Sequence, residues 1–127
     1  MRLRCMTVLL VAVLGGCSWL SDSRQFSVYF EPYSAEPNRQ AHDTVAAAAA
    51  YAQAHPMLPV TIDGYSAPPD PGKDVDGLSA QRADAVKQGL IGDGVAPIRI
   101  TTNANGIADP KNLPSVAVRR VDIQIGQ

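Results

Sequence analysis

Cysteine is scarce in this sequence, which has two in 127 residues, Cys5 and Cys17. Both lie near the N-terminus, where they cannot staple the body of the chain, so the sequence predicts no disulfide framework. Histidine is equally rare. His42 and His55 have no cysteine near them with which to build a metal site, and no metal or other cofactor is predicted.

An excess of basic residues is also missing. The chain has 11 Lys and Arg against 12 Asp and Glu, and its only adjacent basic pair is Arg119-Arg120. A protein that binds nucleic acid would show a basic patch, so nucleic acid is not an expected partner. There is no G-x-S-x-G motif, no P-loop and no nucleophile beside a base, and the sequence therefore does not predict an enzyme.

No apolar run is long enough to cross a membrane. The longest, residues 6–14, is about half the roughly 20 residues that a membrane-spanning helix needs. Arg2 and Arg4 precede it and Gly15-Gly16 follow it. A positive start, a short apolar stretch and small residues are typical of a secretory signal peptide, which we predict for residues 1–16.

The end of this leader, Leu14-Gly15-Gly16-Cys17, resembles the lipobox of bacterial lipoproteins. That resemblance implies that Cys17 is acylated, with palmitate among its chains, and becomes the new N-terminus. Stable anchoring requires more than one acyl chain. Ser18, rather than Asp, follows the cysteine, which in that family favours the outer membrane. The alternative is an ordinary cleaved signal peptide with a chance cysteine.

The remaining residues have the length of one domain. Residues 17–25 are polar without a hydrophobic period, which indicates a lipidated N-terminus with a short tether, and residues 26–127 form the expected domain. Hydrophobic periodicity predicts strands over residues 26–30, 59–65, 98–102 and 118–125, and helices over residues 38–55 and 78–90. The order βαβαββ predicts a two-layer α/β sandwich, with both helices packed on one face of a mixed four-stranded sheet.

One face of the first predicted helix and one loop have a distinctive composition. Val45, Ala48, Ala49 and Ala52 fall on one face of the first helix, and their small side chains allow it to lie close to the sheet. Residues 66–77 contain three prolines, two glycines and three aspartates, a composition typical of a loop. A loop of this length is often functional.

Three motifs resemble those of the OmpA-like peptidoglycan-associating domain: Gly64-Tyr65-Ser66, Leu78-Ser79-Ala80-Gln81-Arg82-Ala83, and Arg119-Arg120-Val121-Asp122-Ile123. The resemblance covers residues 26–125, and implies that the domain grips the free end of diaminopimelate in the peptide stem of the cell wall. In that family an arginine binds the carboxylate and an aspartate the ammonium. Arg82 occupies the arginine position, and its planar guanidinium suits a carboxylate. The alternative for Arg82 is a surface ion pair with Asp84 or a loop carboxylate.

The sequence departs from the family at the aspartate position, which is Ala67, and at two asparagine positions, which are Val75 and Val118. Alanine cannot bind a cation. Three aspartates of the same loop are candidate substitutes for the ammonium ligand: Asp70, Asp74 and Asp76. The alternative is that these aspartates end turns and cap the second helix.

Four further residues are candidate peptidoglycan ligands because they belong to the motifs: Tyr65, Ser66, Arg119 and Arg120. Successive side chains of a strand point to opposite faces, so only one of the two arginines can face the site. Tyr65 is either a wall of the pocket or a core aromatic at a strand end.

These observations favour an outer-membrane lipoprotein whose periplasmic domain contacts peptidoglycan and links the membrane to the cell wall. The alternative is an OmpA-like domain that no longer binds the wall and serves as a structural or interaction subunit of an envelope complex, with other envelope proteins as partners.

Overall fold

The computed structural model describes residues 23–126. The predicted signal peptide, the predicted lipidation site Cys17 and residues 18–22 of the predicted tether lie outside this range. Within it, no helix is both long and apolar enough to span a membrane. The elements are β1 (Arg24–Tyr29), α1 (Arg39–Ala54), β2 (Val60–Ser66), α2 (Leu78–Gly92), β3 (Ile100–Ile107) and β4 (Arg120–Ile125), with short 3-10 turns η1 (Pro97–Arg99) and η2 (Ser115–Val118).

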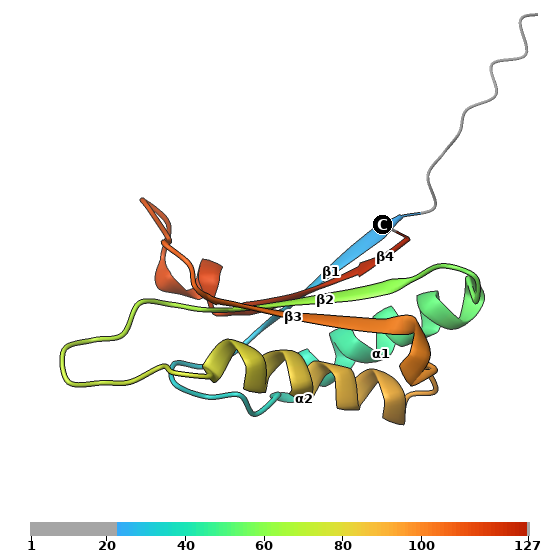
Figure 1. Ribbon diagram of the computed structural model, residues 1–127, viewed down its shortest axis with the longest axis horizontal. Coiled ribbons are helices and arrows are strands. Elements are labelled where there is room, and N and C mark those ends of the chain that lie inside the picture. The colour runs from blue at the N-terminus through green and yellow to red at the C-terminus, as the bar shows by residue number, and fades with distance from the viewer. Residues whose placement is uncertain (1–22, 127) are drawn as a thin grey trace, which may run out of the picture.

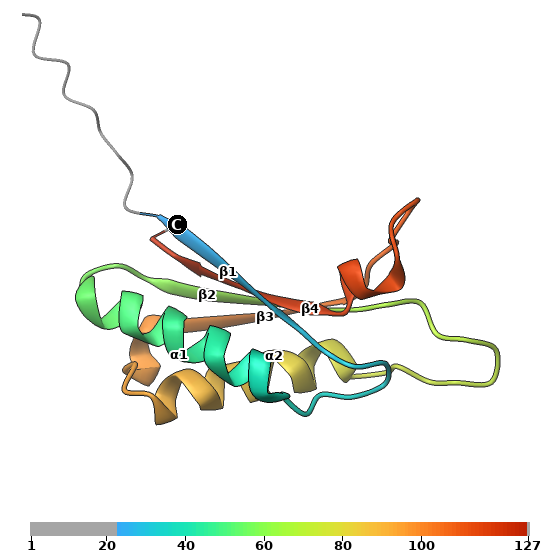
Figure 2. The same cartoon turned by 180° about the vertical axis from the view of Figure 1, so that it is seen from behind.

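The four strands form one mixed sheet in the order β1-β4-β2-β3. The central strand β4 runs antiparallel to both β1 and β2, while β3 runs parallel to β2. Both helices cover the same face of this sheet, as the two opposite views in Figures 1 and 2 show. The predicted fold class, a two-layer α/β sandwich on a mixed four-stranded sheet, is confirmed.

Small residues bring the helices close to the sheet and to each other. Val45, Ala48, Ala49 and Ala52 are all buried on α1, as predicted. A Cβ added to Gly64 of β2 would overlap the carbonyl oxygen of Ser79 on α2. The glycine of the first motif is therefore needed because the main chains of β2 and α2 approach so closely.

The helix boundaries differ in how they are capped. The Asn38 side chain accepts a hydrogen bond from the Ala41 amide at 2.9 Å, which caps the start of α1. In α2 the N-cap is Gly77, in the left-handed region with φ +70°, and no side chain caps the helix. The expectation that a loop aspartate caps the second helix is therefore wrong.

The third strand begins and ends later than predicted. η1 occupies the residues before Ile100, and β3 continues to Ile107 through residues whose composition is typical of a turn. Asn103 and Asn105 remain in strand conformation because their side chains donate to the Asp63 carboxylate on β2, at 2.9 and 3.3 Å. Their exposed, polar character is compatible with a strand at the sheet's edge.

The first and last strands of the chain also differ slightly from prediction. β1 begins at Arg24, two residues earlier than expected, because Arg24 pairs with Ile125 and Gln25 with Gln124. β4 begins at Arg120 rather than residue 118, since η2 precedes it.

Candidate ligand-binding site

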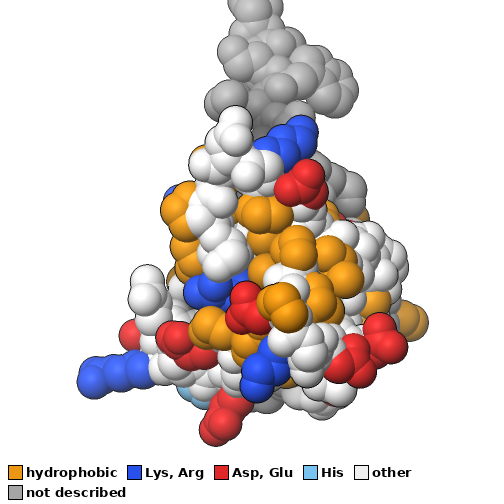
Figure 3. Space-filling model, turned by 90° about the vertical axis from the view of Figure 1, so that its left-hand side faces the viewer, with side chains coloured by type: hydrophobic (Ala, Val, Ile, Leu, Met, Phe, Trp, Pro, Cys, Tyr) orange, Lys and Arg blue, Asp and Glu red, His pale blue; other side chains and the backbone are white. Residues whose placement is uncertain are grey.

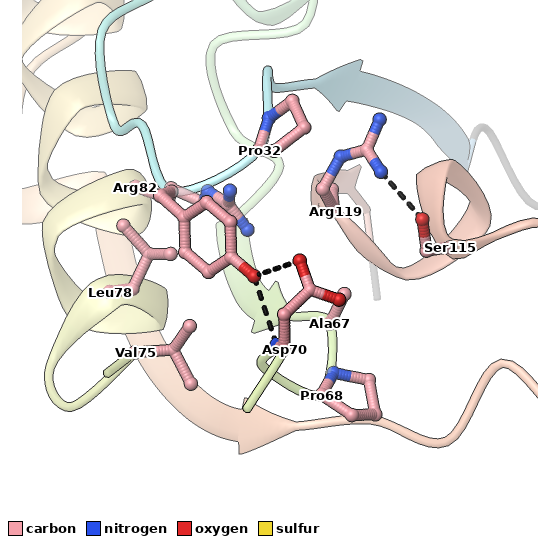
Figure 4. Close-up of a pocket in the computed structure, with 10 residues that line it drawn as sticks. Pro32, Ala67, Pro68, Asp70, Val75, Leu78, Arg82, Ser115 and Arg119 are labelled. Carbon is pink, nitrogen blue, oxygen red and sulfur yellow. Dashed lines mark hydrogen bonds between the residues drawn. The ribbon is translucent and has the colours of Figure 1, made fainter. Parts of the chain in front are cut away.

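A cavity of about 130 Å³ opens at the end of the sheet where β2 leads into the loop of residues 67–77 (Figure 4). Ten residues line it: Pro32, Tyr33, Ala67, Pro68, Asp70, Val75, Leu78, Arg82, Ser115 and Arg119. They come from the β1–α1 loop, the β2–α2 loop, the start of α2 and the segment before β4. Figure 3 looks onto this end, where hydrophobic side chains lie among acidic and basic ones.

Arg82 forms part of the cavity wall yet is completely buried as a residue. Its Nε donates to the Ser34 carbonyl at 2.8 Å, and its two Nη atoms donate to the carbonyls of Tyr65 and Glu31, both at 3.1 Å. These bonds join α2 to β2 and to the β1–α1 loop. The alternative of a surface ion pair for Arg82 is therefore wrong.

The surroundings of Arg82 disfavour its positive charge. Its pKa is lowered to about 10, first because burial removes the guanidinium from water and second because Arg119 places another positive charge nearby. The only ion pair among residues 23–126 joins Arg120 to Asp122. Neither Arg82 nor Arg119 is therefore paired with a carboxylate. An anion bound between Arg82 and Arg119 would be stabilised by both.

Asp70 lines the same cavity and is fixed by Tyr33. The Tyr33 hydroxyl donates to Asp70 Oδ2 at 2.7 Å, and the Asp70 amide donates to the Tyr33 oxygen at 2.9 Å (Figure 4). The bond to the carboxylate raises the pKa of Tyr33, because the neutral phenol is the form that donates. Asp70 therefore has a defined orientation, with carboxylate oxygen lone pairs left for a cation.

The other two loop aspartates lie elsewhere. Asp74 accepts a hydrogen bond from the Asp76 amide at 2.8 Å, which is the turn-forming role considered for these residues. Neither Asp74 nor Asp76 lines the cavity. Of the three candidate substitutes for the missing aspartate, the structure brings only Asp70 together with Arg82.

Of the adjacent residues Arg119 and Arg120, one lines the cavity and the other does not. Arg119 lines the cavity, where its Nε donates to the Phe30 carbonyl at 3.1 Å and its Nη1 to Ser115 Oγ at 2.7 Å. Arg120 instead binds the Asp122 carboxylate at 2.9 Å and lies over the Tyr65 ring, 5.0 Å from its centroid. Arg119 is thus the member of the pair that faces the site.

The remaining motif residues do not line the cavity. Tyr65 is half-buried beside Arg120, so its side chain is neither a cavity wall nor part of the core, although its carbonyl binds Arg82. Ser66 is buried, and its Oγ has no hydrogen-bond partner within the described residues. Ala67 and Val75 give the cavity apolar wall in place of the family's polar residues, and Val118 is buried outside it.

Tyr33 was not among the residues predicted from sequence. It adopts the left-handed conformation, φ +57°, which is uncommon for a residue with a side chain and often occurs at functional sites. No motif marks it. The only available signal was an aromatic residue after a proline in the loop that follows the first strand.

The lining combines two guanidinium groups, one carboxylate and one phenol with an apolar floor. This arrangement suits a zwitterion, such as the amino-acid end of a larger molecule. In the part of the chain that the structure describes, no three side chains of metal-ligating type come together. The fold and cavity therefore define a small α/β domain equipped to bind a charged organic group.

The chain belongs to the OmpA family, whose sequence model matches residues 29–123. The predicted resemblance is thereby confirmed. No curated protein sequence matches the chain.

Solved structures with the same fold include domains of three other proteins. The peptidoglycan-associated lipoprotein of Burkholderia pseudomallei is 24% identical, with a TM-score of 0.62 over 79% of this chain and 89% of that chain. The OmpA-like domain of FopA1 from Francisella tularensis is 19% identical, with a TM-score of 0.66 over 80% and 71%. A putative MotB-like protein from Desulfovibrio vulgaris is 22% identical, with a TM-score of 0.68 over 84% and 76%. At these identities the likeness establishes the fold.

Proposed function

We propose that this protein is an outer-membrane lipoprotein, anchored through Cys17, whose domain binds the diaminopimelate end of a peptidoglycan stem peptide without covalent chemistry. The observation that carries the proposal is the cavity in which Arg82 and Arg119 lie with Asp70. The free end of diaminopimelate bears one carboxylate and one ammonium, and this cavity offers charges opposite to both.

In the proposed complex the ligand carboxylate lies against the Arg119 guanidinium, close enough to the buried Arg82 to be attracted by its charge as well. It offsets the repulsion by Arg119 that, second to burial, lowers the pKa of Arg82. The ligand ammonium contacts Asp70, which Tyr33 holds in place at 2.7 Å. Asp70 thus supplies the negative charge that Ala67 cannot.

One structural relative supports this proposal. The Burkholderia protein is named as a peptidoglycan-associated lipoprotein, and the match covers 89% of its chain. Lipid attachment at Cys17, removal of residues 1–16 and an outer-membrane location rest on the lipobox resemblance.

Co-sedimentation with purified cell-wall sacculi tests the proposal on a soluble form beginning at Ser18. We expect the unmutated domain to pellet with sacculi and Asp70→Asn to remain largely in the supernatant, because the amide removes the charge that holds the ammonium. Asp74→Asn is the matched control, since it makes the same change in the same loop outside the cavity. It should pellet like the unmutated domain.

The alternative function is an OmpA-like domain that has lost wall binding and acts within an envelope complex. Ala67 in the cavity wall is the observation that favours it. If the unmutated domain stays in the supernatant while Ala67→Asp pellets, the fold is competent, the native cavity does not bind the wall, and the alternative holds.

A further inference from the structure

Two exposed apolar side chains lie at the end of the domain away from the cavity. Met57, in the loop between α1 and β2, is 91% exposed, and Ile98, in η1, is 95% exposed. The surrounding residues are Pro56-Met57-Leu58-Pro59 and Ala96-Pro97-Ile98, which contain no charged side chain. Large apolar side chains so fully in water suggest a surface that meets an apolar partner.

A single arginine holds these two loops side by side. Arg99 donates from Nε and Nη2 to the Leu58 carbonyl at 3.2 and 2.8 Å, from Nη2 to the His55 carbonyl at 2.9 Å and from Nη1 to the Ala52 carbonyl at 3.0 Å. Its charge is directed at main-chain oxygens of α1 and the loop after it. Met57 and Ile98 are therefore presented together on a braced surface, which we call the apolar tip.

The N-terminal segment enters the domain beside this tip. Arg24, the first residue of β1, pairs with Ile125, which pairs with Val60, which in turn pairs with Ile100. These four residues form one row across the sheet, next to both loops. Figures 1 and 2 likewise show the start of β1, the α1–β2 loop and the start of β3 at the same end of the molecule.

The length of chain before β1 limits how far the tip can lie from Cys17. Six residues, 18–23, separate Cys17 from Arg24, so a fully extended chain places these two residues at most about 25 Å apart. The cavity end also has exposed apolar residues, such as Leu113 at 63%. That end lies at least the length of β1, about 17 Å, farther along the sheet.

From these constraints we infer that the apolar tip rests on the lipid bilayer, with Met57 and Ile98 in its interfacial region. The inference depends on the proposed lipid anchor at Cys17. Arg24 strengthens it, because this exposed cation lies 5.4 Å from the Tyr51 ring and 5.7 Å from the Phe26 ring at the base of the tip, where it can meet lipid phosphate. The tip thereby orients the cavity toward the cell wall.

The test uses the full chain, matured in a bacterial host and reconstituted into vesicles of phosphatidylethanolamine and phosphatidylglycerol. Met57→Cys, Ile98→Cys and Leu113→Cys are each labelled with an environment-sensitive fluorophore, and nitroxide-labelled lipid is the quencher. Cys5 leaves with the leader and Cys17 is acylated, so each new thiol is unique. Leu113→Cys is the matched control, an exposed apolar position at the opposite end.

We expect nitroxide lipid to quench the labels at 57 and 98 at least about twofold more than the label at 113, because interfacial side chains lie within about 5–10 Å of the acyl boundary. Equal quenching at all three positions, in protein that floats with the vesicles, would overturn the inference and leave the anchor intact. Protein that does not float with the vesicles would remove the anchor, and the membrane contact with it.

Discussion

Arg82 stabilises the fold as well as lining the cavity. Each of its three side-chain nitrogen atoms donates a hydrogen bond to a main-chain carbonyl of the β1–α1 loop or of β2. The motif in which it lies pointed to it from the sequence. Its complete burial could not be predicted, since the three carbonyls come from the β1–α1 loop and the end of β2, whose relative positions depend on the folded sheet. Removing Arg82 should therefore affect stability as well as the proposed ligand binding.

We expect Arg82→Ala to lower the free energy of unfolding by about 2–4 kcal/mol, because it leaves buried carbonyls without donors and opens a void. Urea denaturation followed by circular dichroism measures this. Arg119→Gln should lower the free energy of unfolding by only about 1 kcal/mol, because Arg119 is only partly buried. It should still abolish most sacculus binding, because it removes a charge that lines the cavity. Equal stability of Arg82→Ala and the unmutated domain would contradict the structural role of Arg82.

Replacing Arg82 with lysine should make ligand binding depend on pH. The burial and the nearby Arg119 charge that lower the pKa of Arg82 to about 10 would also lower the pKa of a lysine below its ordinary value of about 10.4. Arg82→Lys should then bind sacculi at pH 7 and lose binding at a lower pH than the unmutated domain, as the amine becomes neutral.

As pH rises, the stability of the Arg82→Lys variant should change in the opposite direction to its ligand binding. A lowered pKa in the folded state means that the unfolded chain holds the lysine proton more tightly. The variant should therefore gain stability as pH rises from the lowered folded-state pKa toward about 10.4, the ordinary pKa of lysine. Co-sedimentation and urea denaturation across this pH range measure the two effects separately. A variant that loses binding at no lower pH than the unmutated domain would show that the cavity does not desolvate this position.

Among individual residues, the chemistry of the cavity was only partly accessible from sequence. The resemblance identified Arg82, and the charge requirement identified the loop aspartates. The choice of Asp70 over Asp74 depends on the path of the loop, which brings Asp70 to the Tyr33 hydroxyl across 37 positions of sequence. Tyr33 itself has no periodicity or motif that distinguishes it.

At the scale of elements, the close approach of α2 to β2 sets the position of Arg82. We expect Gly64→Ala to destabilise the domain by about 1–3 kcal/mol, because the added Cβ overlaps the Ser79 carbonyl and lies 3.0 Å from the Ala83 Cβ. Gly92→Ala is the control at the end of α2, where nothing lies within 4 Å, and should be neutral or stabilise by up to about 1 kcal/mol. Urea denaturation of both variants measures the difference, and similar losses in the two would contradict a packing cause.

Hydrophobic periodicity predicted every helix and strand of the sheet but not all of their ends. α1 and the core strand β4 have strong patterns, and each boundary was predicted to within two residues. β3 was misplaced because Asn103, Asn105 and Gly106 are individually poor strand residues. They extend the strand because Asp63 on the neighbouring strand accepts from both asparagines, a contact between distant residues that no local pattern reveals.

At the scale of the whole molecule, β1 begins at one end of the sheet and the β2–α2 loop lies at the other (Figure 1). The cavity opens beside that loop. If Cys17 is acylated, Cys17→Ser in the full chain should abolish labelling by radioactive palmitate and shift the protein from the outer-membrane fraction to a soluble one. Ser18→Ala is the control and should leave both unchanged. Unaltered fractionation of Cys17→Ser would mean that the leader ends in an ordinary cleavage site.

The central claim is that the cavity of this domain holds the zwitterionic end of diaminopimelate between two arginines and Asp70. An NMR titration of the domain with a stem peptide ending in diaminopimelate tests it most directly, with the lysine-ending peptide, which lacks the second carboxylate, as comparison. We predict that the diaminopimelate peptide shifts the amide signals of Tyr33, Asp70 and Ser115 but not that of Asn103, and that the lysine peptide shifts them far less. Equal shifts with both peptides, or shifts confined to residues outside the cavity, would contradict it.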